Sequence, residues 1–111
     1  MSLAVTKLNK SANLGTIFGT FSVVASSNYA AGGEVLGLQA LFGMRKAPLF
    51  VVVRGMAGFI YEYDYANDKL LVFTNSAGGA NAALTEHTAA AYVAGITGDT
   101  IRGFVKFPKA L

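Results

Sequence analysis

The chain has 111 residues, of which 53% are hydrophobic and 14% charged, with a net charge of +3 and no cysteine. This length suits one domain, and the lack of cysteine excludes disulfides, a thiolate nucleophile and a cysteine zinc site. Charged residues fall well below the usual share of about 25%, so a single copy has few polar side chains with which to cover its surface. We therefore expect the chain to bury apolar surface against other subunits.

Neither a membrane nor a nucleic acid is an expected partner. The longest strongly apolar run, Ala47 to Val53, has basic residues on both sides and is far shorter than the roughly 20 residues that span a bilayer. The basic residues are scattered along the chain, whereas nucleic-acid binding favours a basic stripe. The start, MSLAVTKLNK, lacks the long apolar stretch of a signal peptide, so we expect synthesis and assembly in a cytoplasm.

The first half of the chain predicts one clear strand. Residues Leu3 to Leu8 predict a strand or an extended arm that orders against a partner, and a polar loop follows over Asn9 to Gly15. The β-branched and aromatic residues from Thr16 to Ala25 predict a strand, with a bulge or close contact at Gly19. Ser26 to Gly33 has turn composition. The next ten residues, EVLGLQALFG, fit neither period and predict irregular structure or one short helical turn.

Three further strands are predicted in the middle of the chain. The continuous apolar run from Ala47 to Arg54 predicts a strand that is buried on both faces. Phe59 to Tyr65 and Lys69 to Asn75 predict a pair of strands joined by a tight turn. A flexible connection of Gly, Ala and Asn residues is expected from Ser76 to Thr85.

The last part of the chain completes an all-β prediction. Thr88 to Gly95 is rich in alanine and predicts a helical turn or a strand, and Thr100 to Phe107 alternates as a final strand. Because the strands are short, the turns Gly-rich and long helices lacking, we predict a small β-sandwich or β-barrel of about six to seven strands. Residues 1–14 then form an N-terminal arm, or the first strand and its loop, and residues 15–111 a single β domain.

The stretch GFIYEYDYANDKLLVF, residues 58 to 73, predicts a hairpin with one aromatic face. Strand alternation places Tyr61, Tyr63 and Tyr65 on the same face. A three-residue loop that contains a left-handed Asn or Asp would close the hairpin and set Tyr63 opposite Leu71. The acidic residues of the strand then lie on the opposite, wetter face.

Those acids, Glu62 and Asp64, have a spacing at which a carboxylate pair can perform acid–base chemistry. We favour a purely structural role for these two acids, because alternating strands place polar residues outward and no set of polar partners converges nearby in the sequence. His87 is the one histidine, lacks metal-ligand spacing and is expected at the surface or at a cap. Since nucleophile-elbow and phosphate-loop motifs are also lacking, we expect no enzyme activity, no cofactor and no metal.

Two blocks of the sequence together resemble a known pattern. SSNYAAGGEVL, residues 26 to 36, followed by the hairpin stretch of residues 58 to 73, is similar to small tailed-bacteriophage virion structural proteins of the head decoration, or cement, type. The resemblance covers roughly residues 15 to 108 and implies a β-rich fold without an active site. The chain departs from that pattern at Ala30 and Ala31, where proline is common, and at Asp68, where glycine often ends the turn.

The resemblance implies a decoration protein on the outer capsid surface, where it binds the major capsid protein and stabilises the head. We expect a homotrimer, located in the virion after assembly in the host cytoplasm. The alternative is an aromatic-faced ligand-binding module of a phage tail or cell surface that binds a carbohydrate or a receptor; a hydrolase is a third, weaker hypothesis. The residues expected at an interface are Leu3, Val5, Lys7, Tyr29, Gly32, Gly33, Glu34, Tyr61, Tyr63 and Tyr65.

Overall fold

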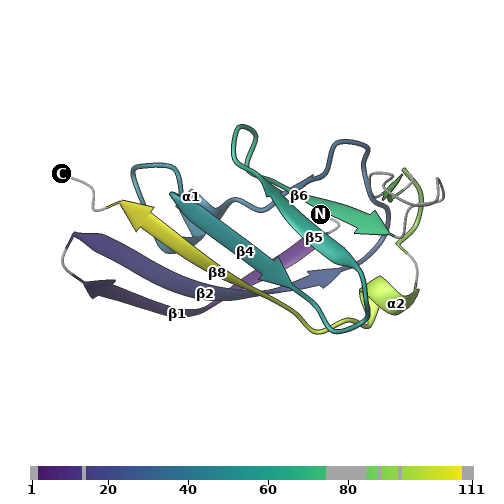
Figure 1. The fold of residues 1–111 in the computed structure, drawn as a ribbon, viewed down its shortest axis with the longest axis horizontal. Coiled ribbons are helices and arrows are strands. Elements are labelled where there is room, and N and C mark those ends of the chain that lie inside the picture. Colours follow the sequence, from purple (N-terminus) through teal and green to yellow (C-terminus); the bar gives the residue numbers. More distant parts are fainter. Residues whose placement is uncertain (1–2, 14, 75–84, 88, 93, 109–111) are drawn as a thin grey trace, which may run out of the picture.

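The computed structural model describes residues 3–13, 15–74, 85–87, 89–92 and 94–108. Within these residues, eight strands form one curled antiparallel sheet with two short helices (Figure 1), which confirms the predicted all-β fold. The elements are β1 (Leu3–Asn13), β2 (Thr16–Ala25), β3 (Glu34–Val35), α1 (Leu38–Phe42), β4 (Phe50–Arg54), β5 (Ile60–Asp64), β6 (Lys69–Thr74), β7 (Thr85–Glu86), α2 (Ala94–Thr97) and β8 (Ile101–Pro108). Most of the connection predicted over Ser76 to Thr85 lies outside the described residues.

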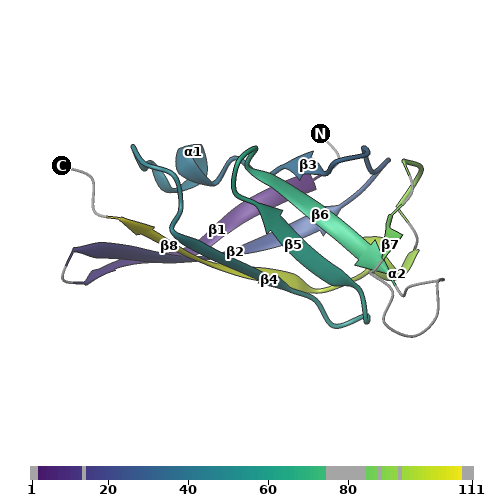
Figure 2. The same cartoon turned by 45° about the horizontal axis from the view of Figure 1, so that its top comes forward.

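The sheet is held together by pairing between distant parts of the chain. Its strand order is β1-β2-β8-β4-β5-β6-β3, and β7 also pairs with β6. The last strand, β8, therefore lies between β2 and β4 in the middle of the sheet. Figure 2 shows β5 and β6 rising away from β4 and β8, so that the sheet curls into a half-barrel.

The core lies on the inner face of this curl. Alternate residues of the central strands point there, and the rings of Phe21 and Phe42 lie directly against the sheet. A Cβ at Gly103 would overlap the ring of Phe21, and one at Gly19 would overlap the ring of Phe42. Glycine at these two places lets an aromatic ring pack on the backbone of a strand, which confirms the close contact predicted at Gly19.

The short helix α1 covers the inner face beside β1. Left-handed glycines bound it on both sides, Gly37 with φ 69° and Gly43 with φ 67°, a conformation that glycine adopts without steric cost. The Lys10 ammonium on β1 donates a hydrogen bond of 2.7 Å to the carbonyl of Phe42, one of the carbonyls that a helix end leaves free. This agrees with the one short helical turn expected here.

At the N-terminus, the structure corrects a boundary. The predicted loop over Asn9 to Gly15 is wrong, because β1 continues to Asn13 and pairs with β2 along its length, with an irregularity between Lys7 and Asn9. Gly15, with φ 92°, lies in the tight return between the two strands. The segment expected as a strand or an arm is thus an edge strand that pairs with its own chain.

Two predictions about the middle strands are also wrong. β4 buries alternate residues only, since Val51 and Val53 are 7% and 5% exposed while Phe50 is 50% exposed; the reason is that one sheet has an open outer face. In the hairpin of β5 and β6, Tyr63 pairs with Leu70 rather than Leu71. The loop has four residues instead of three, although its left-handed residue is Asp68 (φ 54°), as the turn chemistry predicted.

Candidate interaction face

Four apolar side chains gather on the outer face of β2, β8 and β4. We call Phe18, Phe50, Val52 and Phe104 the outer apolar patch. Phe104 pairs with Val52 across the β8–β4 ladder, and its ring stacks on Phe18 with centroids 5.8 Å apart. Phe104 is 38% exposed. Like Phe50, it is a large apolar side chain that points away from the core. Contiguous exposed apolar surface of this kind is typical of interaction sites.

Positive charges border the outer apolar patch. The Lys106 ammonium lies 5.9 Å from the centroid of the Phe18 ring, within the range of a cation–π attraction. Arg54 and Arg102 are register partners on β4 and β8, and both side chains are exposed. Because opposite charges attract across an interface, this border favours a partner that carries acidic groups around an apolar centre.

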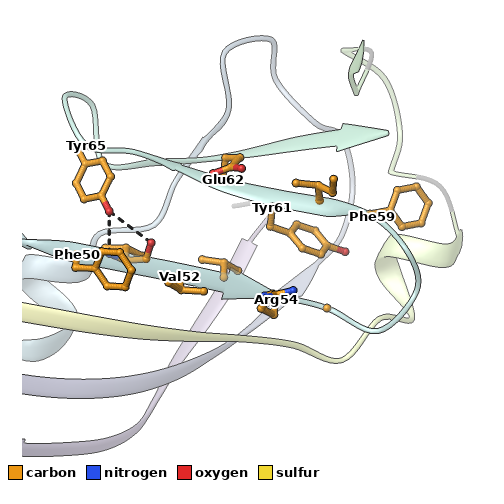
Figure 3. Close-up of a pocket in the computed structure, with 11 residues that line it drawn as sticks. Phe50, Val52, Arg54, Phe59, Tyr61, Glu62 and Tyr65 are labelled. Carbon is orange, nitrogen blue, oxygen red and sulfur yellow. Dashed lines mark hydrogen bonds between the residues drawn. The ribbon is translucent and has the colours of Figure 1, made fainter. Parts of the chain in front are cut away.

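Beside the patch, an open groove separates β4 from β5. The register of these fully described strands contains one paired position, Val53 with Tyr61. Away from it the strands diverge and leave a groove of about 480 Å³ (Figure 3). Outward-facing groups from both strands line it, among them Phe50, Val52, Arg54, Ile60 and Glu62.

The open end of the groove is bridged by Tyr65, which comes from the turn after β5. The backbone N–H of Val51 donates to the Tyr65 hydroxyl at 3.0 Å, and the same hydroxyl lies 3.5 Å from the Val51 carbonyl oxygen. Both contacts are drawn in Figure 3. Tyr65 is nonetheless 47% exposed, so this tyrosine is accessible from solvent while it satisfies a backbone group of β4.

The closed end of the groove is fixed by an acid. Asp99 accepts hydrogen bonds from the Tyr61 hydroxyl and from the Met56 N–H, each 2.7 Å long. Burial, followed by the bond to Asp99, raises the pKa of Tyr61 well above its ordinary value. Burial also acts to raise the pKa of Asp99, but its hydrogen bonds outweigh that effect and the net shift is downward. Asp99 is therefore held as a carboxylate that anchors the loop between β4 and β5.

The acids of the hairpin lie on the outer face, and one of them is bound to the turn. Glu62 and Asp64 share the outer face, as predicted, and Glu62 is exposed. Asp64 accepts bonds from the Ala66 N–H and the Asn67 side-chain amide. The bond from the Asn67 side chain is the largest cause that lowers the pKa of Asp64. Asp64 thus caps the turn, a common role for Asp at this position.

The expected surface histidine is instead buried, and that expectation is wrong. His87 is 7% exposed, and its ring lies 5.2 Å from Tyr29 and 5.5 Å from Tyr92, centroid to centroid. The neighbouring Glu86 accepts the Tyr29 hydroxyl at 2.6 Å and the Gly32 N–H at 2.9 Å. Burial, then the bond to Glu86, raises the pKa of Tyr29. This cluster fastens the turn before β3 onto β7.

The residues expected at an interface do not form one surface in the single chain. Those buried in the core or against the backbone are Leu3, Tyr29, Gly33, Tyr61 and Tyr63; Val5 and Glu34 are half-buried; Lys7, Gly32 and Tyr65 are exposed. The buried side chains serve the fold, so they are not available to a partner in this structure. The outer apolar patch was missed, although Phe104 between Arg102 and Lys106 was a signal: an aromatic residue at an outward position of an alternating strand.

Other kinds of site find no support in the described part of the chain. In it, no three His, Asp or Glu side chains lie close enough together to hold a metal ion, and none of its helices is long and apolar enough to cross a membrane. A scan against protein-family models, a search of curated proteins and a search of solved structures each gave no match.

Proposed function

We propose that the protein is a structural subunit that attaches to a protein shell through the outer apolar patch. More specifically, we propose a head decoration protein of a tailed bacteriophage, which binds the major capsid protein and works as a homotrimer. The observation on which this depends is the exposure of aromatic side chains at Phe50 and Phe104, on a sheet face with a cationic border. Covering such a face with a partner lowers the free energy by about 25 cal/mol for each Å² of apolar surface removed from water.

The two sequence blocks behind the phage resemblance are neighbours in space. SSNYAAGGEVL includes β3, and the hairpin block includes β5 and all of β6 except its last residue. Glu34 and Val35 of the first block pair with Leu70 and Lys69 of the second, and the Leu36 N–H donates to the Asp68 carbonyl at 2.9 Å. The two blocks therefore make one structural unit, which supports the proposal that their joint resemblance to the phage pattern reflects a shared structure.

The test is co-sedimentation with shells assembled from the major capsid protein of the genome that carries this gene. We expect the wild-type protein to pellet with the shells and to raise their resistance to heat. Replacing Phe50 and Phe104 together by serine should weaken binding about tenfold or more, because central aromatic anchors supply much of an interface's affinity. Val24→Ser, an exposed outer position beyond the patch, is the matched control and should bind as the wild type does.

Two results would contradict the proposal. Wild-type protein that stays in the supernatant and leaves the heat resistance of the shells unchanged would remove the decoration role. Sedimentation of the free protein as a monomer at all concentrations would remove the homotrimer.

The alternative, a ligand-binding module, is supported by one observation. The groove between β4 and β5 has a volume of about 480 Å³, within the range of small-molecule sites. Tyr61 and Tyr63 are buried, so Tyr65 is the exposed tyrosine of the three that this alternative names. If a carbohydrate or receptor binds there, it should protect Tyr65 from iodination, and an unchanged rate of Tyr65 iodination in its presence would dispose of this alternative.

A further inference from the structure

At Val51, the backbone of β4 is hydrogen-bonded to a side chain instead of to a neighbouring strand. In an antiparallel ladder, one residue of the neighbouring strand exchanges both an N–H···O and an O···H–N bond with the residue opposite it. At Val51 the single hydroxyl of Tyr65 occupies this place, 3.0 Å from the nitrogen and 3.5 Å from the carbonyl oxygen. A hydroxyl can accept from an N–H and donate to a carbonyl, so Tyr65 imitates a strand residue at the point where β5 has diverged.

Tyr65 is placed so that it can leave. It belongs to the turn rather than to a strand, it is 47% exposed, and its ring lies edge-on to the ring of Tyr63 at a centroid distance of 5.0 Å. The contact to the Val51 carbonyl is long for a hydrogen bond. Rotation of this side chain toward solvent would uncover a donor and an acceptor of β4 at the open end of the groove.

We propose that this groove binds a short extended segment of the partner protein, which displaces Tyr65 and pairs with β4 at Val51. The inference rests on the proposed function, since the partner is the shell protein. Main-chain pairing supplies affinity in this kind of recognition, and alternate side chains supply specificity. Outward side chains of the segment would meet Phe50 and Val52, which are apolar. Inward side chains have to be small, because Tyr61 and Tyr63 occupy the inner side.

A second copy of this chain is a poorer occupant. Arg54 and Arg102 lie side by side on the face next to the groove, with Lys106 on the same outer face of β8. Two copies that met through this face would bring their cations together, which costs free energy across an interface. An extended arm of a different protein, with its acidic groups toward Arg54 and Arg102 and away from Glu62 on the β5 side of the groove, would avoid that repulsion.

Tyr65→Phe tests the proposal with shells as the probe. The variant keeps the ring but removes the hydroxyl that competes with the incoming segment, so we expect it to bind shells about three- to tenfold more tightly than the wild type. Tyr63→Phe is the matched control: it loses a hydroxyl hydrogen bond of 2.6 Å to Asp68 but none to Val51, and should bind shells no more tightly than the wild type.

Hydrogen exchange gives a second readout that does not depend on affinity. The Val51 amide should exchange faster in free Tyr65→Phe than in the free wild type, and it should become protected in both proteins on shells. A thermal melt confirms that each variant is folded.

The outcomes separate this inference from the proposed function. The groove proposal would be overturned if the wild type binds shells, Tyr65→Phe binds them with unchanged affinity and the Val51 amide stays unprotected on shells. That result would leave the proposed decoration role standing. No binding of the wild type would overturn both. If Tyr65→Phe associates with itself more strongly in sedimentation velocity, the occupant is a second copy and the proposed partner is wrong.

Discussion

The inner and outer faces of β2, β8 and β4 carry similar apolar residues but have different surroundings. On the inner face, Phe21 and Val105 are fully buried under α1 and the curled half of the sheet. On the outer face, one residue away along the same strands, Phe104 and Phe50 are exposed. Apolar character by itself therefore does not separate core from interface in this chain; the curl of the sheet does.

The difference explains how a chain with 14% charged residues folds without all of its apolar surface being covered. The inner face closes on itself, because glycines at positions 19 and 103 admit aromatic rings against the backbone. The outer face has no such closure and keeps its aromatic residues for a partner, under the function proposed above. Mutations of the same type on the two faces should consequently differ in what they impair.

The largest contrast is expected between Phe21→Ala and Phe104→Ala. Removing the buried Phe21 ring leaves a cavity against Gly103 and should lower the free energy of unfolding by about 3–5 kcal/mol. Removing the exposed Phe104 ring should lower it by less than about 1 kcal/mol while weakening attachment to shells. Urea denaturation of the two variants measures the first effect, and co-sedimentation the second.

Equal losses of stability in the two variants would contradict the comparison, because they would show that the outer ring is also part of the core. The slope of the urea transition serves as a control. It should be unchanged if each substitution acts on stability alone.

The sequence predicted much of the inner face and little of the outer one. The β-branched and aromatic composition of β2 and the alternation in β5 and β8 indicated strands, and the turn chemistry predicted a left-handed Asn or Asp in the hairpin loop, which is Asp68. The run FVVVR of β4 looked buried on both sides, because a strand with apolar residues at every position gives no sign of which face is open. Whether other elements cover a given face of a sheet depends on the path of the whole chain. The local pattern of apolar residues in one strand does not determine that path.

The parts of the site that were missed depend on distant pairs. Tyr29 and Glu86, which are joined by a hydrogen bond, are 57 residues apart in the chain, and His87 packs against the rings of Tyr29 and Tyr92. The groove exists because β4 and β5 pair at Val53 and Tyr61 and then diverge, and no local signal marks such a divergence. One extra loop residue also moved the hairpin register by one, since register depends on loop length.

A smaller contrast is expected within β4 itself. Val53→Thr places a hydroxyl in the inner core and should lower the free energy of unfolding by about 1–3 kcal/mol. Val52→Thr makes the same change on the outer face and should alter it by less than about 0.5 kcal/mol. The two positions are adjacent, so propensity for the strand is matched. Thermal unfolding of both proteins would show the difference, and a reversed order would mean that the faces have been assigned the wrong way round.

The smallest expected effect concerns Asp99, at the end of the groove where the inner residue Tyr61 meets the loop after β4. Asn at this position keeps an acceptor but loses the charge, so Asp99→Asn should lower the free energy of unfolding at neutral pH by about 1 kcal/mol. The pKa of Asp99 is lowered in the folded protein. A carboxyl with a lowered folded pKa contributes stability above its unfolded value of about 3.9 and loses that contribution as the pH falls through the folded value.

The difference in unfolding free energy between the wild type and Asp99→Asn should therefore be constant from neutral pH down to about pH 4 and shrink below it. Denaturant titrations over this range measure it. Asp64→Asn is the control: its folded pKa is lowered too, but it caps the exposed turn after β5. Because the Met56 N–H donates to Asp99, Asp64→Asn should leave the exchange of the Met56 amide unchanged. If this difference in unfolding free energy instead grows on acidification, the Asp99 carboxylate is not what anchors the loop. The loop at the closed end of the groove would then have to be held by other contacts.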